Sequence, residues 1–328
     1  MSITSGERQD CKFINKECVH MFITKEMLIE KGACREGIAW FEKHFPEGSD
    51  YQEALNVAAS QNEAGFAQWG LQQFGSTNAV MEVEEINCEA SIFFAGKIIV
   101  KGAIKIANWL LAGDGIKAGS GIKAGSGIEA GDGIKAGSGI EAGDGIKAGS
   151  GIKAGWGIKA GSGIKAGSGI EAGDGIKAGS GIKAGSGIEA GDGIKAGSGI
   201  KAGWGIKAGS GIEAGSGIEA GDGIKAGSGI EAGSGIEAGD GIKAGSGIEA
   251  GSGIEAGSGI EAGWGIKAGW GIKAGWGIKA GDDYGIYAGL RLRISLKTQY
   301  AVIVAKEQPQ NIILGSYKTL ENKDSGAA

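Results

Sequence analysis

This sequence has very little proline, and it lacks long apolar runs and a secretion signal. The chain of 328 residues holds 2 prolines beside 70 glycines. Collagen requires abundant proline with glycine at every third residue, so the composition excludes it. No apolar run approaches the roughly 18 residues of a membrane span. The opening residues MSITSGERQD lack the charged start and apolar core of a secretion signal. We therefore expect a cytoplasmic protein with no membrane partner.

The cysteines are few and follow no disulfide pattern. They are Cys11, Cys18, Cys34 and Cys88. Unpatterned cysteines without a secretion signal indicate reduced thiols in a cytosol. Cys11, Cys18 and His20 lie at spacings that match no familiar zinc motif, so we expect neither a metal site nor a cofactor.

The glycine-rich tract of residues 114–281 lacks His, Cys, Tyr, Arg, Asn and Thr. An enzyme needs particular acids, bases or nucleophiles at defined positions. The Ser, Asp, Lys and Glu of the tract recur in copy after copy, and no copy stands out as a catalytic site. We therefore expect no catalytic residues and no enzyme. Ice binding by flat threonine arrays is excluded as well. The tract carries 17 Lys, 11 Glu and 7 Asp, and this near-neutral balance argues against nucleic acid.

A period of six residues organises the tract. Isoleucine recurs at every sixth residue from Ile116 to Ile278, within the hexad Gly-(Ser/Asp/Trp)-Gly-Ile-(Lys/Glu)-Ala. Because six is divisible by two, an extended chain places Ile and Ala on one face and Lys/Glu on the other. A helix is excluded, since two glycines per hexad would cost about 2 kcal/mol relative to alanine.

The hexad predicts a mainly β protein, a parallel β-solenoid. Ile-Lys/Glu-Ala strands alternate with Gly-X-Gly corners, where glycine permits positive φ. We favour a three-sided coil of three hexads. A coil of two hexads and a meander of hairpins are the alternatives, and the signs of stacked Lys and Glu do not separate the two coil lengths. In a three-sided coil, two acidic ladders would form: Glu213/Glu231/Glu249 and Glu219/Glu237/Glu255.

The period extends beyond the perfect hexads at both ends. Steps of six backward from Ile116 meet Leu110, Ile104, Ile98, Ile92, Ile86 and Val80, and steps forward from Ile278 meet Tyr284, Leu290, Leu296 and Val302. We therefore predict four parts: a helical module at residues 1–79, a cap of degenerate repeats at 80–113, the perfect solenoid at 114–281, and a strand-rich cap or dimer seam at 282–328.

Helix signals concentrate in residues 24–75. Thr24 is placed to cap KEMLIEKG, Pro46 ends ACREGIAWFEKHF, and Asp50 with Glu53 resembles a capping box. Phe66, Trp69 and Phe74 share one helix face and predict a small core. Near the C-terminus, LRLRISLK, YAVIVA and NIILGSY predict strands, whose apolar edge invites self-association.

Five tryptophans replace Ser or Asp at the hexad corner. They are Trp156, Trp204, Trp264, Trp270 and Trp276. A position that accepts a charged residue must be open to solvent, and exposed tryptophan is enriched at binding hot spots. We predict that these five residues bind a protein partner. The alternative is that they cover glycine-bared backbone or, near the C-terminus, seal the solenoid against the final strands.

The segments GACREGIAWFEKHFPEG, AGWGIKAG and YAGLRLRISL resemble phage- and prophage-encoded proteins that join a short helical module to glycine-rich hexapeptide repeats. The resemblance implies a phage origin and a scaffold architecture, and it carries no catalytic motif. We therefore expect a non-enzymatic cytosolic protein that engages, sequesters or inhibits a host macromolecule such as a defence factor. A structural component of a virion or fibre is the alternative.

Overall fold

The computed structural model describes residues 2–3, 21–292 and 294–320. The chain folds as a parallel β-solenoid of about 13 turns with a few N-terminal helices and a strand-rich C-terminal end. It divides into two compact units, residues 1–168 and residues 169–328, called here the N-terminal and C-terminal units.

Regular strands follow the hexads, and irregular strands flank them. The regular strands run from β10 (Ile116–Ala118) to β36 (Ile272–Ala274), each a triplet that starts six residues after the previous one. The flanking strands are β1 (Ser2–Ile3), β2 (Phe22–Ile23), β3 (Ser49–Asp50), β4 (Val80–Val83), β5 (Glu85–Cys88), β6 (Ile92–Phe94), β7 (Lys97–Val100), β8 (Ile104–Ile106), β9 (Leu110–Ala112), β37 (Ile278–Lys279), β38 (Ile286–Tyr287), β39 (Val302–Ala305), β40 (Ile312–Leu314) and β41 (Ser316–Thr319).

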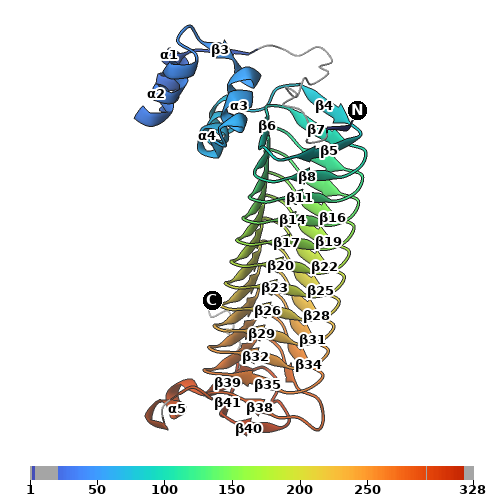
Figure 1. Ribbon diagram of the computed structural model, residues 1–328. Coiled ribbons are helices and arrows are strands. Elements are labelled where there is room, and N and C mark those ends of the chain that lie inside the picture. The colour runs from blue at the N-terminus through green and yellow to red at the C-terminus, as the bar shows by residue number, and fades with distance from the viewer. Residues whose placement is uncertain (1, 4–20, 293, 321–328) are drawn as a thin grey trace, which may run out of the picture. The chain divides into compact units, whose positions relative to one another are not determined.

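Every third strand pairs in parallel, which fixes the coil at 18 residues. Ile116 of β10 pairs with Ile134, and Ile206 pairs with Ile224. The strands of each unit therefore form three parallel sheets, called sheet 1 (with β8 and β11 in the N-terminal unit), sheet 2 (with β7 and β10) and sheet 3 (with β6 and β9). Within the N-terminal unit, Figure 1 shows β5, β8, β11 and β14 (Ile140–Ala142) stacked one above another. The predicted three-sided coil is confirmed, and the two-hexad coil and the hairpin meander are wrong.

The side-chain alternation gives the solenoid its core. In strands such as β25 (Ile206–Ala208), the isoleucine and alanine are buried and the lysine between them is exposed. The isoleucines of the perfect hexads are at most 5 % exposed. Charged residues stay in water because an unpaired buried charge is too costly, so the two-residue period decides which face closes inward.

The corner glycines do not use the positive φ that glycine permits. In residues 114–281, all of which the structure describes, no glycine has a positive φ. The reason for glycine is close packing between turns. A Cβ on Gly209 would lie 1.7 Å from the carbonyl oxygen of Gly191, one turn before it. The first corner glycine therefore excludes a side chain by contact, and not by its backbone conformation.

The irregular repeats begin one residue later than the period predicts. Met81, and not Val80, pairs with Ile98, and Met81 is buried. The remaining backward steps, from Ile86 to Leu110, are buried as predicted. The predicted inward position of Val80 is wrong, because the spacing between β4 and β7 is 17 residues, one short of the 18-residue coil.

In the described residues that precede the solenoid strands, four helices are present: α1 (Lys25–Glu30), α2 (Arg35–His44), α3 (Tyr51–Ser60) and α4 (Ala64–Phe74). Thr24 accepts a hydrogen bond from the Met27 amide, and Asp50 accepts from the Gln52 and Glu53 amides, so both predicted caps are confirmed. Phe66, Trp69 and Phe74 pack against a core that includes Phe41 and Leu55, as the helix face predicts.

The forward steps of six fail at the C-terminal end. Tyr284, Leu290 and Leu296 are exposed, and the buried positions are taken by Ile286 and Ile303, which pair with Ile266 and Ile272. The segment LRLRISLK is not a strand: α5 (Ile294–Tyr300) begins within it and occupies its second half. The predicted strands in YAVIVA and NIILGSY are present as β39, β40 and β41.

Candidate partner-binding surface

The five corner tryptophans are all exposed. Their exposed fractions lie between 51 % and 63 %: Trp156, Trp204, Trp264, Trp270 and Trp276. Each tryptophan follows the first glycine of its corner, a position that admits no side chain. The indole is therefore the first large group that a molecule approaching the corner would contact. Their predicted role in partner binding stays a prediction.

Trp264, Trp270 and Trp276 occupy three successive corners of one turn in the C-terminal unit. They alternate with β34 (Ile260–Ala262), β35 (Ile266–Ala268), β36 and β37. Their carbonyl oxygens accept hydrogen bonds from the amides of Gly281 at 3.0 Å, Gly289 at 2.7 Å and Lys306 at 2.8 Å, respectively. The backbone of this turn therefore anchors the irregular C-terminal segment at each corner.

The side chains of these three tryptophans make a second set of contacts to that segment. Trp264 stacks on Tyr284, with ring centroids 5.8 Å apart. Trp270 contacts Tyr300 at 5.9 Å, and the Lys306 ammonium lies 4.9 Å from the Trp276 ring. The three indoles thus hold the C-terminal segment and still present about half of their surface to solvent. The hexad period gives no sign of Tyr300 or Lys306, because both lie in the irregular region.

Trp156 and Trp204 have a different environment. Among the residues that the structure describes, neither contacts another aromatic ring or a cation. Trp204 follows β24 (Ile200–Ala202), and Asp222 occupies the same corner one turn later, after β27 (Ile218–Ala220). Their backbone amides donate to Ser138 and Ser186 of the preceding turn, and their exposed indoles have no aromatic or cationic partner within the described ranges.

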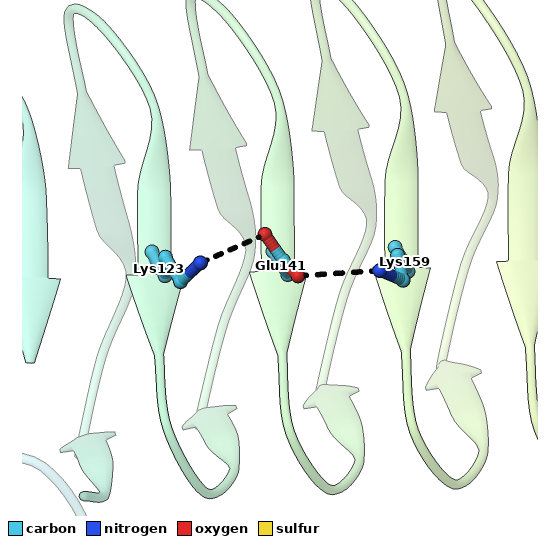
Figure 2. A network of polar contacts seen from close by, with 3 residues as sticks. All are labelled: Lys123, Glu141 and Lys159. Atoms are coloured by element: carbon cyan, nitrogen blue, oxygen red, sulfur yellow. Dashed lines mark hydrogen bonds and ion pairs between the residues drawn. The ribbon is translucent and has the colours of Figure 1, made fainter. Parts of the chain in front are cut away.

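Ladders of exposed charge run along the sheets. Figure 2 shows Lys123, Glu141 and Lys159 on successive strands of sheet 1, with Glu141 held by ion pairs of 3.3 and 3.4 Å. Hydrogen bonds from Lys123 and then Lys159 lower the pKa of Glu141. All three side chains are well exposed, so each pair is worth at most about 1 kcal/mol.

The two predicted acidic ladders are present in the C-terminal unit. Glu213 pairs in register with Glu231, and Glu231 with Glu249, on sheet 1. Glu219, Glu237 and Glu255 are stacked in the same way on sheet 3. Lys207, Lys225 and Lys243 form a basic ladder on sheet 2. Stacked like charges destabilise a sheet.

The helices contact the solenoid through a side-chain amide. The Gln52 amide donates to the Phe93 carbonyl oxygen and accepts from the Ala95 amide, both at 2.8 Å. Phe93 belongs to β6, the edge strand of sheet 3, so Gln52 of α3 occupies the place of a further strand. Sequence patterns do not reveal this contact, because a glutamine on a helix has no distinguishing spacing.

Residues 21–76 match the YdhT N-terminal domain. No curated protein and no solved structure matches the chain. The YdhT N-terminal domain match covers α1 to α4 and ends before β4. In this chain the matched domain thus lies against the first strands of the solenoid through Gln52.

Two further observations concern metal binding and membrane spans. Within residues 2–3, 21–292 and 294–320, no group of three or more His, Cys, Asp or Glu side chains is arranged to hold a metal ion. Cys11, Cys18 and His20 lie outside these ranges. None of the described helices is both long and apolar enough to cross a membrane.

Proposed function

We propose that the protein is a non-enzymatic scaffold that binds a host protein through tryptophans at the corners of its solenoid. The observation that supports it is the exposure of Trp156 and Trp204, 62 % and 63 %, without an aromatic or cationic contact among the described residues. A large indole left in water is unfavourable, and tryptophan is the residue type most enriched at binding hot spots.

The proposed setting is the cytosol of a bacterial host. The resemblance of the helical segment and the repeat to phage- and prophage-encoded proteins supports it, and so does the exposed free thiol of Cys34, which suits a reducing compartment. The partner in this proposal is a host factor such as a defence component, which the protein sequesters or inhibits.

Affinity capture from bacterial lysate tests the proposal. Trp156→Ser/Trp204→Ser restores the residue that most hexads carry, so the circular-dichroism spectrum should not change. Proteins that co-purify with the wild type should be lost with this variant. Ser198→Ala, at another corner, is the matched control and should retain them.

Two results would count against the proposal. Undiminished capture by the double tryptophan variant would show that these residues do not bind the partner. Abundance of the protein in purified phage particles would instead favour the alternative role as a structural component of the virion or a fibre.

A further inference from the structure

A row of alternating charge blocks lies on sheet 1 of the C-terminal unit. It is formed by the central residues of β20 (Ile176–Ala178), β23 (Ile194–Ala196), β26 (Ile212–Ala214), β29 (Ile230–Ala232), β32 (Ile248–Ala250) and β35. In this order the residues are Lys177, Lys195, Glu213, Glu231, Glu249 and Lys267, which we call the sheet-1 row.

Most of the sheet-1 row has no ion pair inside the chain. Lys195 and Glu213 pair at 2.7 Å. Lys177 lies in register with Lys195, and Glu231 lies between Glu213 and Glu249. Within the described part of the chain, Lys177, Glu231 and Glu249 have no salt bridge. Lys177 therefore lies beside a like charge and Glu231 between two like charges, whereas Glu249 lies in register with Glu231 on one side and Lys267 on the other.

The row is antisymmetric about the midpoint between Lys195 and Glu213. The symmetry holds for its first four residues: Lys177 and Lys195 precede this point, and Glu213 and Glu231 follow it at equal spacing, about 4.8 Å per turn. A two-fold axis parallel to the strands, placed over this midpoint, brings a second copy face to face with its turns in reverse order. Lys195 then faces Glu213 of the second copy, and Lys177 faces Glu231.

We propose that two copies of this chain associate antiparallel through the sheet-1 row. The contact is isologous and closed, so it yields a dimer and not a fibre. Lys177 and Glu231, which lack partners in one chain, obtain partners in two. Lys195 and Glu213 join their counterparts in a square of alternating charge.

A second copy fits this row better than an unrelated basic or acidic partner does. Its row has the same spacing by construction, so all four pairs come into register without any adjustment of the backbone. Sheet 3 repeats the sign pattern, with Lys183, Lys201, Glu219 and Glu237, but its acidic ladder is paired at both ends, by Lys201–Glu219 and Lys273–Glu255. On sheet 2 the basic ladder is likewise paired at both ends, by Glu189 and Glu261. In the described part of the C-terminal unit, sheet 1 therefore carries more charged side chains without a salt bridge than sheet 2 or sheet 3 does.

The dimer is expected to depend on salt. Ion pairs between exposed side chains are weak, and ions screen them within about 8 Å at physiological ionic strength. Sedimentation velocity of the full chain at 20 mM salt should show a monomer–dimer equilibrium whose dissociation constant rises at least tenfold at 500 mM.

Charge reversal tests the geometry. Lys177→Glu/Lys195→Glu and Glu213→Lys/Glu231→Lys each place like charges opposite one another, so each variant alone should be monomeric. An equimolar mixture of the two restores every pair and should dimerise again. The quadruple variant, which carries all four changes, is antisymmetric once more and should dimerise by itself.

The equivalent reversals on sheet 3, Lys183→Glu/Lys201→Glu and Glu219→Lys/Glu237→Lys, are the matched controls and should leave the dimer intact. A wild-type chain that stays monomeric at 20 mM salt would overturn the proposal. So would a dimer that the sheet-3 variants abolish and the sheet-1 variants do not, or a mixture that stays monomeric although circular dichroism shows both variants folded.

Discussion

At the scale of single residues, the two glycines of each corner have different neighbours. A Cβ on Gly209 would lie 1.7 Å from the Gly191 carbonyl oxygen, whereas a Cβ on Gly211 would lie 3.3 Å from that of Gly229. Gly209→Ala must push two turns apart and break the hydrogen bond from the Gly209 amide to Ala190. We expect it to lower the free energy of unfolding by about 3 kcal/mol or more.

Gly211→Ala is the matched control, two residues away on the same corner. Its Cβ has room after a shift of a few tenths of an ångström, so the change should cost less than about 1 kcal/mol. Urea unfolding followed by circular dichroism measures both variants. Equal losses in the two variants would show that the corner needs glycine for another reason.

Tyr51 in α3 is a second residue whose burial makes a prediction. Its side chain is 1 % exposed, and its hydroxyl has no hydrogen-bond partner among the residues whose structure is described. A buried hydroxyl without a partner destabilises the folded state. Tyr51→Phe should therefore leave the free energy of unfolding unchanged or raise it by about 1 kcal/mol. Tyr317→Phe, which removes a hydroxyl that donates to the Ala305 carbonyl at 3.0 Å, should lower it.

The same residue predicts a dependence on pH. Burial raises the pKa of Tyr51 above its ordinary value near 10. Above about pH 10 the unfolded tyrosine loses its proton while the folded one keeps it, so this group makes the folded state less stable as pH rises. The stability advantage of Tyr51→Phe over the wild type should thus grow between pH 9 and pH 11 in urea titrations. A constant difference would contradict the prediction.

At the scale of secondary-structure elements, α3 covers the edge of sheet 3. Gln52→Ala leaves the Phe93 carbonyl and the Ala95 amide of this edge without their partner. The expected loss is about 1–3 kcal/mol of unfolding free energy, with increased light scattering because open strand edges associate. Gln52→Glu should lose less, since a carboxylate still accepts from the Ala95 amide but cannot donate to Phe93. Gln72→Ala, at an exposed position of α4, should change neither measurement.

The regular elements could be predicted from sequence, and the irregular ones only in part. Ile, Lys/Glu and Ala alternate at a period that matches a strand, so the buried faces follow from the cost of burying charge alone. The segment from Leu290 to Leu296 also alternates, yet it forms no strand and α5 begins within it, because Ile286 and Ile303 fill the next inward positions. Local alternation does not specify which of several apolar residues closes the core.

For the candidate site as well, some features could be predicted from the sequence and others could not. Exposure of the five tryptophans could be predicted, because Ser and Asp occupy the equivalent corners. The contacts of Trp264 with Tyr284, and of Trp276 with Lys306, could not, since they join segments whose spacing follows no period. The hydrogen bond from Gln52 to Phe93 of β6 could not be predicted for the same reason, since the spacing of these two residues follows no period.

At the scale of the whole molecule, interior turns are interchangeable and terminal turns are not. Each turn of a solenoid contacts mainly its neighbours, so a turn can be removed if the register survives. Deleting residues 228–245 joins Gly227 to Ser246, preserves the hexad, and brings Ile260 into register with Ile224. It also removes one member from each like-charge ladder. We expect the melting temperature to change by less than about 4 °C.

A deletion of equal length at the C-terminal end should behave differently. Removing residues 302–319 takes away β39, β40 and β41, and with them the partners of Ile272 and Ile286, which are at most 1 % exposed in the intact chain. The exposed isoleucines and strand edges should lower the melting temperature by more than the interior deletion does and should promote association. Thermal melts with simultaneous light scattering compare the two. If the interior deletion proved the more damaging, stability would reside in the particular sequence of each turn, and the stack of equivalent turns would not be the principle that holds this chain together.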